Sequence, residues 1–220
     1  MNDILNKLYA IFVADAHWML LLQGLLATVA ITLLSLAAGT LLGGVVYLGT
    51  RSQHTWLRTL TGWYRVIVRG TPVMVLLLTL YYVVLQGDGG MFAAIVAFSL
   101  NFSNFACGIM QSSIDSVGKG QIEAGRALGL NRMQILRYIV APQALRNAMP
   151  AYKFQAVTLV KGTSVVGYVS ILDLTQATQA IRTGTGMSLL PLVAVTAIYF
   201  LLAWLMNKML DSIVKTASRV

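Results

Sequence analysis

The chain has 220 residues, of which 57% are hydrophobic and only 10% are charged, and its formal net charge is +9. A soluble domain carries about 25% charged residues, so this composition excludes a chain whose surface mostly faces water. Its basic residues occur in short clusters between apolar stretches, which is typical of membrane topology and not of a nucleic-acid-binding surface. We therefore predict an all-α membrane protein with no nucleic-acid partner.

Five segments are apolar enough to cross the hydrocarbon core as helices, which takes about 20 mostly apolar residues each. In chain order the predicted transmembrane spans are 18–48, 66–86, 90–114, 154–173 and 186–207. The first, third and fifth contain no charged residue, whereas Arg69 interrupts the second and Lys161 the fourth. We expect a helix break near Arg69, because Gly70 and Pro72 follow it.

The first span carries Ser35, Gly39 and Gly43 at four-residue spacing. Small residues on one face let a second helix approach closely in lipid, where packing drives association. We expect that helix to belong to the same chain, although a seam between two copies would use the same pattern.

The basic residues also predict an orientation. Most of the 16 lysines and arginines lie in the segments 51–69, 115–153 and 208–220, and the positive-inside rule places these segments in the cytoplasm. Five spans then place an N-terminal segment, 1–17, outside and a C-terminal tail, 213–220, in the cytoplasm.

The longest connection between spans, 117–150, has the signals of two short helices. Residues 121–128 read as one helix, which Gly129 ends. Asn131 and Gln134 have the spacing of a capping box that opens a second helix, and we expect Pro142 to terminate it. The loop is therefore predicted to be a compact protrusion.

Within this loop, Glu123-Ala124-Gly125 is followed after three residues by Gly129 and after nine more by Ile139-Val140-Ala141-Pro142. This spacing resembles the EAA loop of ATP-binding-cassette importer permeases, with Gly125 and Ala141 departing from the usual residues. The sequences RGTP at 69–72 and KGTS at 161–164, with Asp173-Leu174, resemble the polar-amino-acid branch of that family. The resemblance implies a type I transmembrane domain over 18–212 in the bacterial cytoplasmic membrane.

The resemblance also implies partners. A separate dimer of ATPase subunits would bind ATP and Mg and contact the loop 123–142, and a second permease subunit, identical or similar, would complete the pore. An extracytoplasmic solute-binding protein would deliver the amino-acid substrate. The coupling residues would be Glu123, Ala124, Gly125, Gly129, Ile139 and Pro142. Glu123 would contact the ATPase, or alternatively cap or pair within the loop, for instance with Arg126.

The residues themselves give no sign of catalysis in this chain. No G-x-x-x-x-G-K-[ST] motif occurs, and His17 and His54 stand alone without metal-ligand spacing. We expect a non-catalytic subunit with no cofactor and no metal of its own.

Polar residues at membrane depth are candidates for the translocation path or its gate. These candidates are Arg69, Thr71, Asn101, Asn104, Lys161, Thr163 and Ser164. Lys161 could bind a substrate carboxylate or line a gate, or it could extend toward the cytoplasmic interface. Asn101 and Asn104 could line a polar path or join helices. The competing function is a membrane scaffold or channel component without an ATPase.

Overall fold

The computed structural model describes residue 9 and residues 16–217, so most of the predicted outer segment 1–17 lies outside the described residues. Over the described residues the chain forms helices and their connections, with no strand, which confirms the all-α class. Three of the described helices are each long and apolar enough to cross a membrane. These are α2 (His17–Thr50), α5 (Gly90–Asp115) and α10 (Leu189–Ala217), of which α2 and α5 cover the first and third predicted spans and α10 begins three residues after the predicted start of the fifth.

The second predicted span, 66–86, is not one helix. Helix α3 (Thr55–Gly70) begins well before it, and the chain then bends by 105° into α4 (Val73–Leu78) and the π-helical segment η2 (Thr79–Val84). Thr71 takes an extended conformation, because Pro72 disfavours the helical region for the residue before it. The helix break after Arg69 was predicted. The start of α3 at Thr55 was missed, because the arginines of this helix lower its mean hydropathy.

The fourth predicted span, 154–173, also differs. One helical segment runs through α7 (Arg132–Ile135), the π-helical η3 (Leu136–Val140) and α8 (Ala141–Gly162), and η4 (Thr163–Val169) extends it as a 3₁₀ helix. The prediction that Pro142 ends a helix is therefore wrong. The wider π turn just before it accommodates a residue without an N–H, and Pro142 lies in the first turn of α8.

Two shorter helices complete the chain, α6 (Lys119–Ala127) and α9 (Leu174–Thr185). The sequence analysis missed α9, which turns by 57° from the preceding helix. Asp173 caps its start by accepting a hydrogen bond from the Gln176 N–H at 2.9 Å. Gly186, with φ +67°, ends it.

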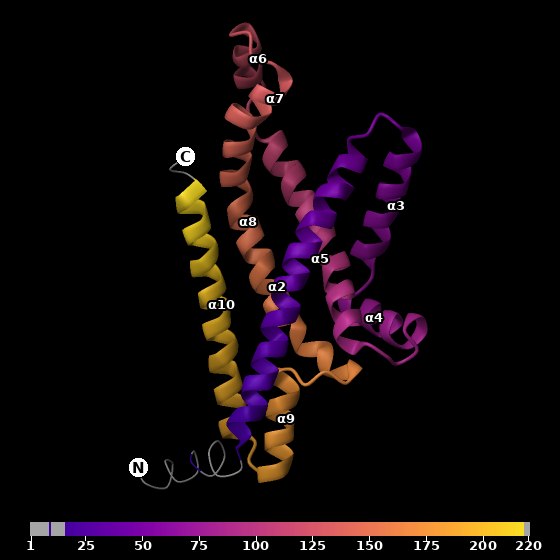
Figure 1. Cartoon of the computed structure of the whole chain (residues 1–220), viewed down its shortest axis with the longest axis vertical. Helices are drawn as coiled ribbons and strands as arrows, with labels where there is room; N and C mark the ends of the chain where they lie inside the picture. The colour runs from indigo at the N-terminus through magenta and orange to yellow at the C-terminus, as the bar shows by residue number, and fades with distance from the viewer. Residues whose placement is uncertain (1–8, 10–15, 218–220) are drawn as a thin grey trace.

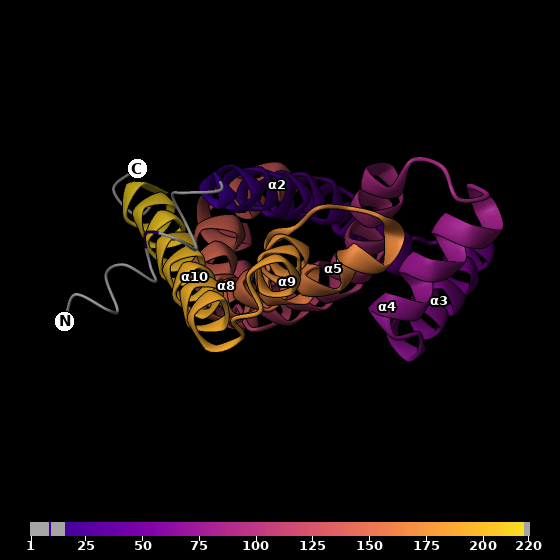
Figure 2. The same ribbon diagram turned by 90° about the horizontal axis from the view of Figure 1, so that it is seen from below.

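Helices α2, α5, α8 and α10 run along the length of the molecule (Figure 1). Helices α6 and α7 lie at one end with the last turns of α10, whereas α9 and the start of α2 lie at the other. Helices α3 and α4 form a wing on the side away from α10 (Figure 2).

The small residues of α2 pack against α5 in the same chain. Ser35 donates a hydrogen bond to the carbonyl oxygen of Ile95 at 3.3 Å. A β-carbon added at Gly39 would lie 2.9 Å from the Ser99 carbonyl oxygen, and one at Gly43 would lie 2.6 Å from the β-carbon of Ala106. This face of α2 is thus occupied within the chain, as expected.

Helix α2 also packs against the start of α9, at the other end of the molecule, and against α8. A β-carbon at Gly24 would lie 2.6 Å from the carbonyl oxygen of Asp173, at the start of α9. The hydroxyls of Thr40 and Tyr152 share a hydrogen bond of 2.7 Å between α2 and α8. The buried core lies between these helices and includes Ile31, Phe98, Phe102 and Val166.

The close packing of α2 against α5 leads us to expect different effects on stability when each of two adjacent glycines of α2 is replaced by alanine. Gly43→Ala should lower stability by about 1–3 kcal/mol, because its methyl group would overpack against Ala106 and the Ser103 backbone. Gly44→Ala meets nothing closer than the Met110 side chain at 4.0 Å, so it should be neutral or slightly stabilising. Thermal unfolding in detergent measures both, and equal melting temperatures would contradict the close packing of this seam.

Candidate functional site

The protrusion at one end of the molecule, residues 119–135, begins with α6 and a precise C-terminal cap. Gly129 has φ +78°, which glycine adopts without a steric penalty. Its N–H donates to the Arg126 carbonyl oxygen at 2.9 Å, and the Leu130 N–H donates to that of Gly125 at 3.1 Å. This pair of bonds is a Schellman motif, so the predicted role of Gly129 as a helix terminator is confirmed.

The predicted capping box at the start of α7 is also present. The Asn131 N–H donates to Oε1 of Gln134 at 2.8 Å, and the Gln134 N–H donates to Oδ1 of Asn131 at 2.9 Å. Both helix ends in the turn 128–131 are therefore satisfied by local hydrogen bonds, and the two helices meet at a defined angle.

A small apolar core holds the protrusion to the helices beneath it. Its buried members are Val117, Ile135, Val140 and Ala144, packed by Ile114, Ile122, Leu130 and Ile139. Gly125 is buried on this core, where an added β-carbon would lie 2.7 Å from Cδ1 of Ile139. Gly125 and Ile139 thus pack α6 against the following helix, whereas Ala124 and Pro142 are exposed.

The outer surface of the protrusion combines one acid with apolar tips. Glu123 is exposed and makes no hydrogen bond or ion pair with any described residue, so the capping or pairing role with Arg126 finds no support. Leu128 is 81% exposed and Met133 is 69% exposed. This arrangement leaves one carboxylate and two apolar side chains exposed on a capped helical turn.

Two ion pairs tie the long helices together. Arg51, after α2, pairs with Asp115 at the end of α5, and Lys153 of α8 pairs with Asp211 of α10. The hydrogen bond and charge of Asp115 raise the pKa of Arg51, which stays protonated.

We expect substitutions of Gly129 to lower the local stability of the protrusion. Gly129→Ala should destabilise the turn by about 1–2 kcal/mol through left-handed strain alone, since an added β-carbon would meet no other atom within 4 Å. Gly129→Asn should cost less, because asparagine tolerates this conformation better. Hydrogen exchange of the amides at 119–135 measures the difference, and equal protection in both variants would contradict it.

At membrane depth, Asn101 of α5 lines a small cavity of about 90 Å³ beside α8. Its other polar side chains are Gln155 and Thr158, which sequence analysis missed. The cavity is completed by Val73, Phe98, Phe102, Leu159 and Gly162. Gln155, Thr158 and Gly162 share one face of α8, and this i, i+3, i+7 spacing was the signal that could have identified them.

The other predicted path residues do not converge on this cavity. Asn104 is buried on α5, Thr163 is buried and donates to the Val160 carbonyl oxygen at 2.7 Å, and Thr71 donates to that of Ile67 at 2.8 Å. Both threonine contacts are local to their helices. Ser164 is half-buried, and Arg69 and Lys161 are exposed. Arg69 lies in the last turn of α3, at the break, and not at the start of that helix.

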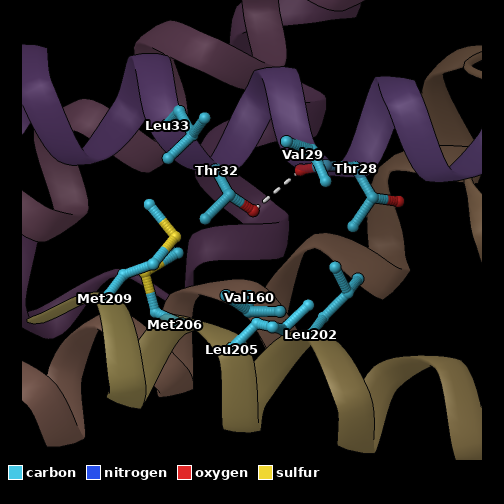
Figure 3. Close-up of a pocket in the computed structure, with 9 residues that line it drawn as sticks. All are labelled: Thr28, Val29, Thr32, Leu33, Val160, Leu202, Leu205, Met206 and Met209. Atoms are coloured by element: carbon cyan, nitrogen blue, oxygen red, sulfur yellow. Dashed lines mark hydrogen bonds between the residues drawn. The ribbon is translucent and has the colours of Figure 1, made fainter.

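A second groove lies between α2 and α10 and is apolar (Figure 3). Its volume is about 190 Å³, and Val29, Leu202 and Met206 are among its lining residues. Its hydroxyls belong to Thr28 and Thr32, and Thr32 donates to the Thr28 carbonyl oxygen at 2.7 Å. The groove therefore offers little to a charged solute. Among the described residues there is also no group of three or more His, Cys, Asp or Glu side chains placed to hold a metal.

Comparison with known proteins agrees with this architecture. Residues 35–216 match the family of binding-protein-dependent transport system inner membrane components. The octopine transport system permease protein OccM of Rhizobium meliloti is 32% identical over 167 residues, 70% of this chain and 68% of that protein. The L-cystine transport system permease protein TcyB of Bacillus subtilis is 31% identical over 172 residues, 77% of this chain and 74% of that protein.

A solved structure described as an amino acid ABC transporter with histidines has a TM-score of 0.82 and 28% identity, covering 93% of this chain and 98% of that chain. The chain belongs to the family of binding-protein-dependent transport system inner membrane components. It is a multi-pass permease subunit of an ATP-binding-cassette transport system, and its similar proteins include permeases of amino-acid transport systems.

Proposed function

We propose that this chain forms half of the pore of an ATP-driven importer for polar amino acids. The observation that carries the proposal is the rigid protrusion 119–135, whose spacing matches a coupling loop and whose exposed surface has no partner among the described residues. Membership of this transport family argues against the alternative function, a scaffold or channel component without an ATPase. An amino-acid cargo is supported by the similar proteins, which are named as permeases of octopine and L-cystine transport systems.

The protrusion would contact a separate ATPase subunit. Glu123 would make a polar contact, while Leu128 and Met133 would insert into an apolar groove of the partner. Gly125, Gly129 and Ile139 would act by holding α6 in place, and the exposed Ala124 of α6 and Pro142 of α8 would add to the contact surface. A rigid helix transmits a subunit rotation that a flexible loop would absorb.

The proposed contact between the protrusion and the ATPase also sets the orientation of the chain and the roles of its other partners. ATP and Mg would be bound by the ATPase dimer, and the chain itself would be non-catalytic. The protrusion and the end of α10 would lie in the cytoplasm, with the start of α2 and helix α9 outside. There a solute-binding protein would deliver the amino acid. A second permease subunit, identical or similar, would complete the pore.

The cavity at Asn101 would lie on the solute path. Amide and hydroxyl groups of Asn101, Gln155 and Thr158 can hydrogen-bond both the ammonium and the carboxylate of a zwitterion. Arg69 and Lys161 would supply positive charge to the carboxylate. Asn104, Thr163, Thr71 and Ser164 would support the helices around this path.

Removing the carboxylate of the protrusion should uncouple the two subunits. Glu123→Ala should leave membrane insertion and thermal stability unchanged, because the exposed side chain makes no hydrogen bond or ion pair with the described residues, yet reduce ATP-dependent uptake about tenfold through one lost charged contact. Asp88→Asn, which removes an exposed acid before α5, is the control and should retain full uptake. Uptake in proteoliposomes is the measurement, and normal uptake by Glu123→Ala would remove the coupling role.

Two threonines with the same local hydrogen bond test the path. Thr158 donates to the Phe154 carbonyl oxygen at 2.8 Å, and Thr196 of α10 donates to that of Leu192 at 2.8 Å. Thr158→Val and Asn101→Leu should each lower uptake about tenfold while the ATPase still co-purifies, because they remove polar groups from the cavity. Thr196→Val should leave uptake intact. Equal uptake by all three variants would show that the cavity is not on the path.

A further inference from the structure

Helix α3 presents three distinct faces. Arg58, Arg65 and Arg69 lie at positions i, i+7 and i+11, which places them within about 40° of one another around the helix. We call this the arginine face. Tyr64 and Val68 lie about a quarter-turn away on the packed side, where the Tyr64 hydroxyl and Ser103 Oγ share a hydrogen bond of 2.6 Å.

The third side of α3 is apolar and open. Trp56, Leu60, Trp63 and Ile67 recur at helical spacing, and each is between 59% and 64% exposed. Lipid can cover such a stripe, which also carries the tryptophans that favour membrane interfaces. The arginine face cannot face lipid in the same way, because a charged side chain at membrane depth turns toward water, a partner or a cavity.

The positive charges of this face are not neutralised within the described part of the chain. Arg58 and Arg69 are exposed, and their guanidinium groups make no hydrogen bond or ion pair there. Arg65 donates to Oε1 of Gln111 at 3.4 Å, and its buried Nε has no partner. None of the described acids forms an ion pair with these arginines: Asp115 and Asp211 pair with other residues, Asp173 is buried, and the exposed Asp88 and Glu123 form no ion pair with a described residue.

The arginine face extends along α3 between the end of the molecule that carries the protrusion and the helix break next to the polar cavity. From Thr55, at the same end of the molecule as the protrusion, α3 carries Arg69 about 21 Å along its axis. Arg69 then stands at the break before Val73, which lines the cavity of Asn101, Gln155 and Thr158. The three arginines are therefore spaced along α3 from the end near the protrusion to the break that precedes Val73.

We propose that the arginine face lines the water-filled inner half of the solute path and draws amino acids along it by their carboxylates. This rests on the proposed function and narrows its substrate class. Acidic and neutral amino acids pass, whereas cationic ones are repelled by the positive charge of these arginines, which form no ion pair with the described acids. Arginine suits this role because its planar guanidinium binds carboxylates with two hydrogen bonds.

The first test asks whether the face meets water, and it does not depend on any cargo. In the full complex, Arg69→Cys and the matched control Ile67→Cys are treated with anionic and cationic methanethiosulfonate reagents of similar size; the native Cys107 is buried. The cysteine at 69 should react, at least about threefold faster with the anionic reagent, and high salt should erase the difference. The cysteine at 67 should stay unreactive. An unreactive position 69, or equal rates for both reagents, would overturn the proposal.

The second test measures selectivity in proteoliposomes that contain the complete transporter, with aspartate, glutamine and lysine as probes. Arg58→Gln, Arg65→Gln and Arg69→Gln should each lower the aspartate-to-glutamine uptake ratio, by up to about tenfold, and raise the lysine-to-glutamine ratio. Arg146→Gln, exposed on α8, is the control and should change neither ratio.

A parallel fall of all three substrates would mean a structural role and would refute the selectivity. Lysine uptake by the unmodified protein as fast as aspartate uptake would refute it too, while leaving the importer function standing. If no amino acid is transported, the proposed function itself fails, and the thiol reactivities then decide alone whether the face lines water.

Discussion

The close approach of α2 to α5 is the constraint on which the rest of this structure depends. In a lipid environment apolar side chains gain little by leaving the solvent, so backbone proximity and hydrogen bonds must hold helices together. Gly39 and Gly43 leave no room for a β-carbon against α5, and Ser35 bonds across the seam. Because α2 also contacts α9 through Gly24 and α8 through Thr40, these helices form a frame.

The units that serve transport are attached to this frame in two different ways. The wing of α3 and α4 is attached at the side and breaks at Pro72, so a charged helix face ends beside the polar cavity. The protrusion instead continues into one helical segment from Arg132 to Gly162, which carries Gln155 and Thr158. We infer that a tilt imposed on the protrusion moves the cavity wall directly, without a hinge at Pro142. The π turn before it and Pro150 are the places where this rod can bend.

Much of this could be predicted from the sequence wherever one local signal decided the outcome. The charge-free runs located α2, α5 and α10, the residues Asn131 and Gln134 located a helix start, and Gly129 located a helix end. Predictions failed where two signals competed. Arg58 and Arg65 hid the start of α3 from hydropathy, and Pro142 suggested an end that the π turn prevents. Helix α9 was missed because the fourth predicted span was extended to Asp173, and the capping role of that residue was not considered.

The contents of the cavity could not be predicted for a different reason. Asn101 and Gln155 lie on helices that are far apart in sequence, and their meeting depends on how α5 and α8 pack. The same holds for the bond between Tyr64 and Ser103, which sets the rotation of α3 and thereby the direction of its arginines. The sequence identifies polar and charged residues whose burial in a membrane costs free energy. Which of these residues lie next to one another depends on how the helices pack.

The central claim is that this chain moves amino acids inward with energy supplied by another subunit. The most direct measurement is the accumulation of a labelled amino acid in proteoliposomes containing the purified complex, with and without ATP on the side of the protrusion. Accumulation above the external concentration should require both ATP and the ATPase subunit. Accumulation that proceeds without either of them, or simple equilibration in the presence of both, would contradict the claim.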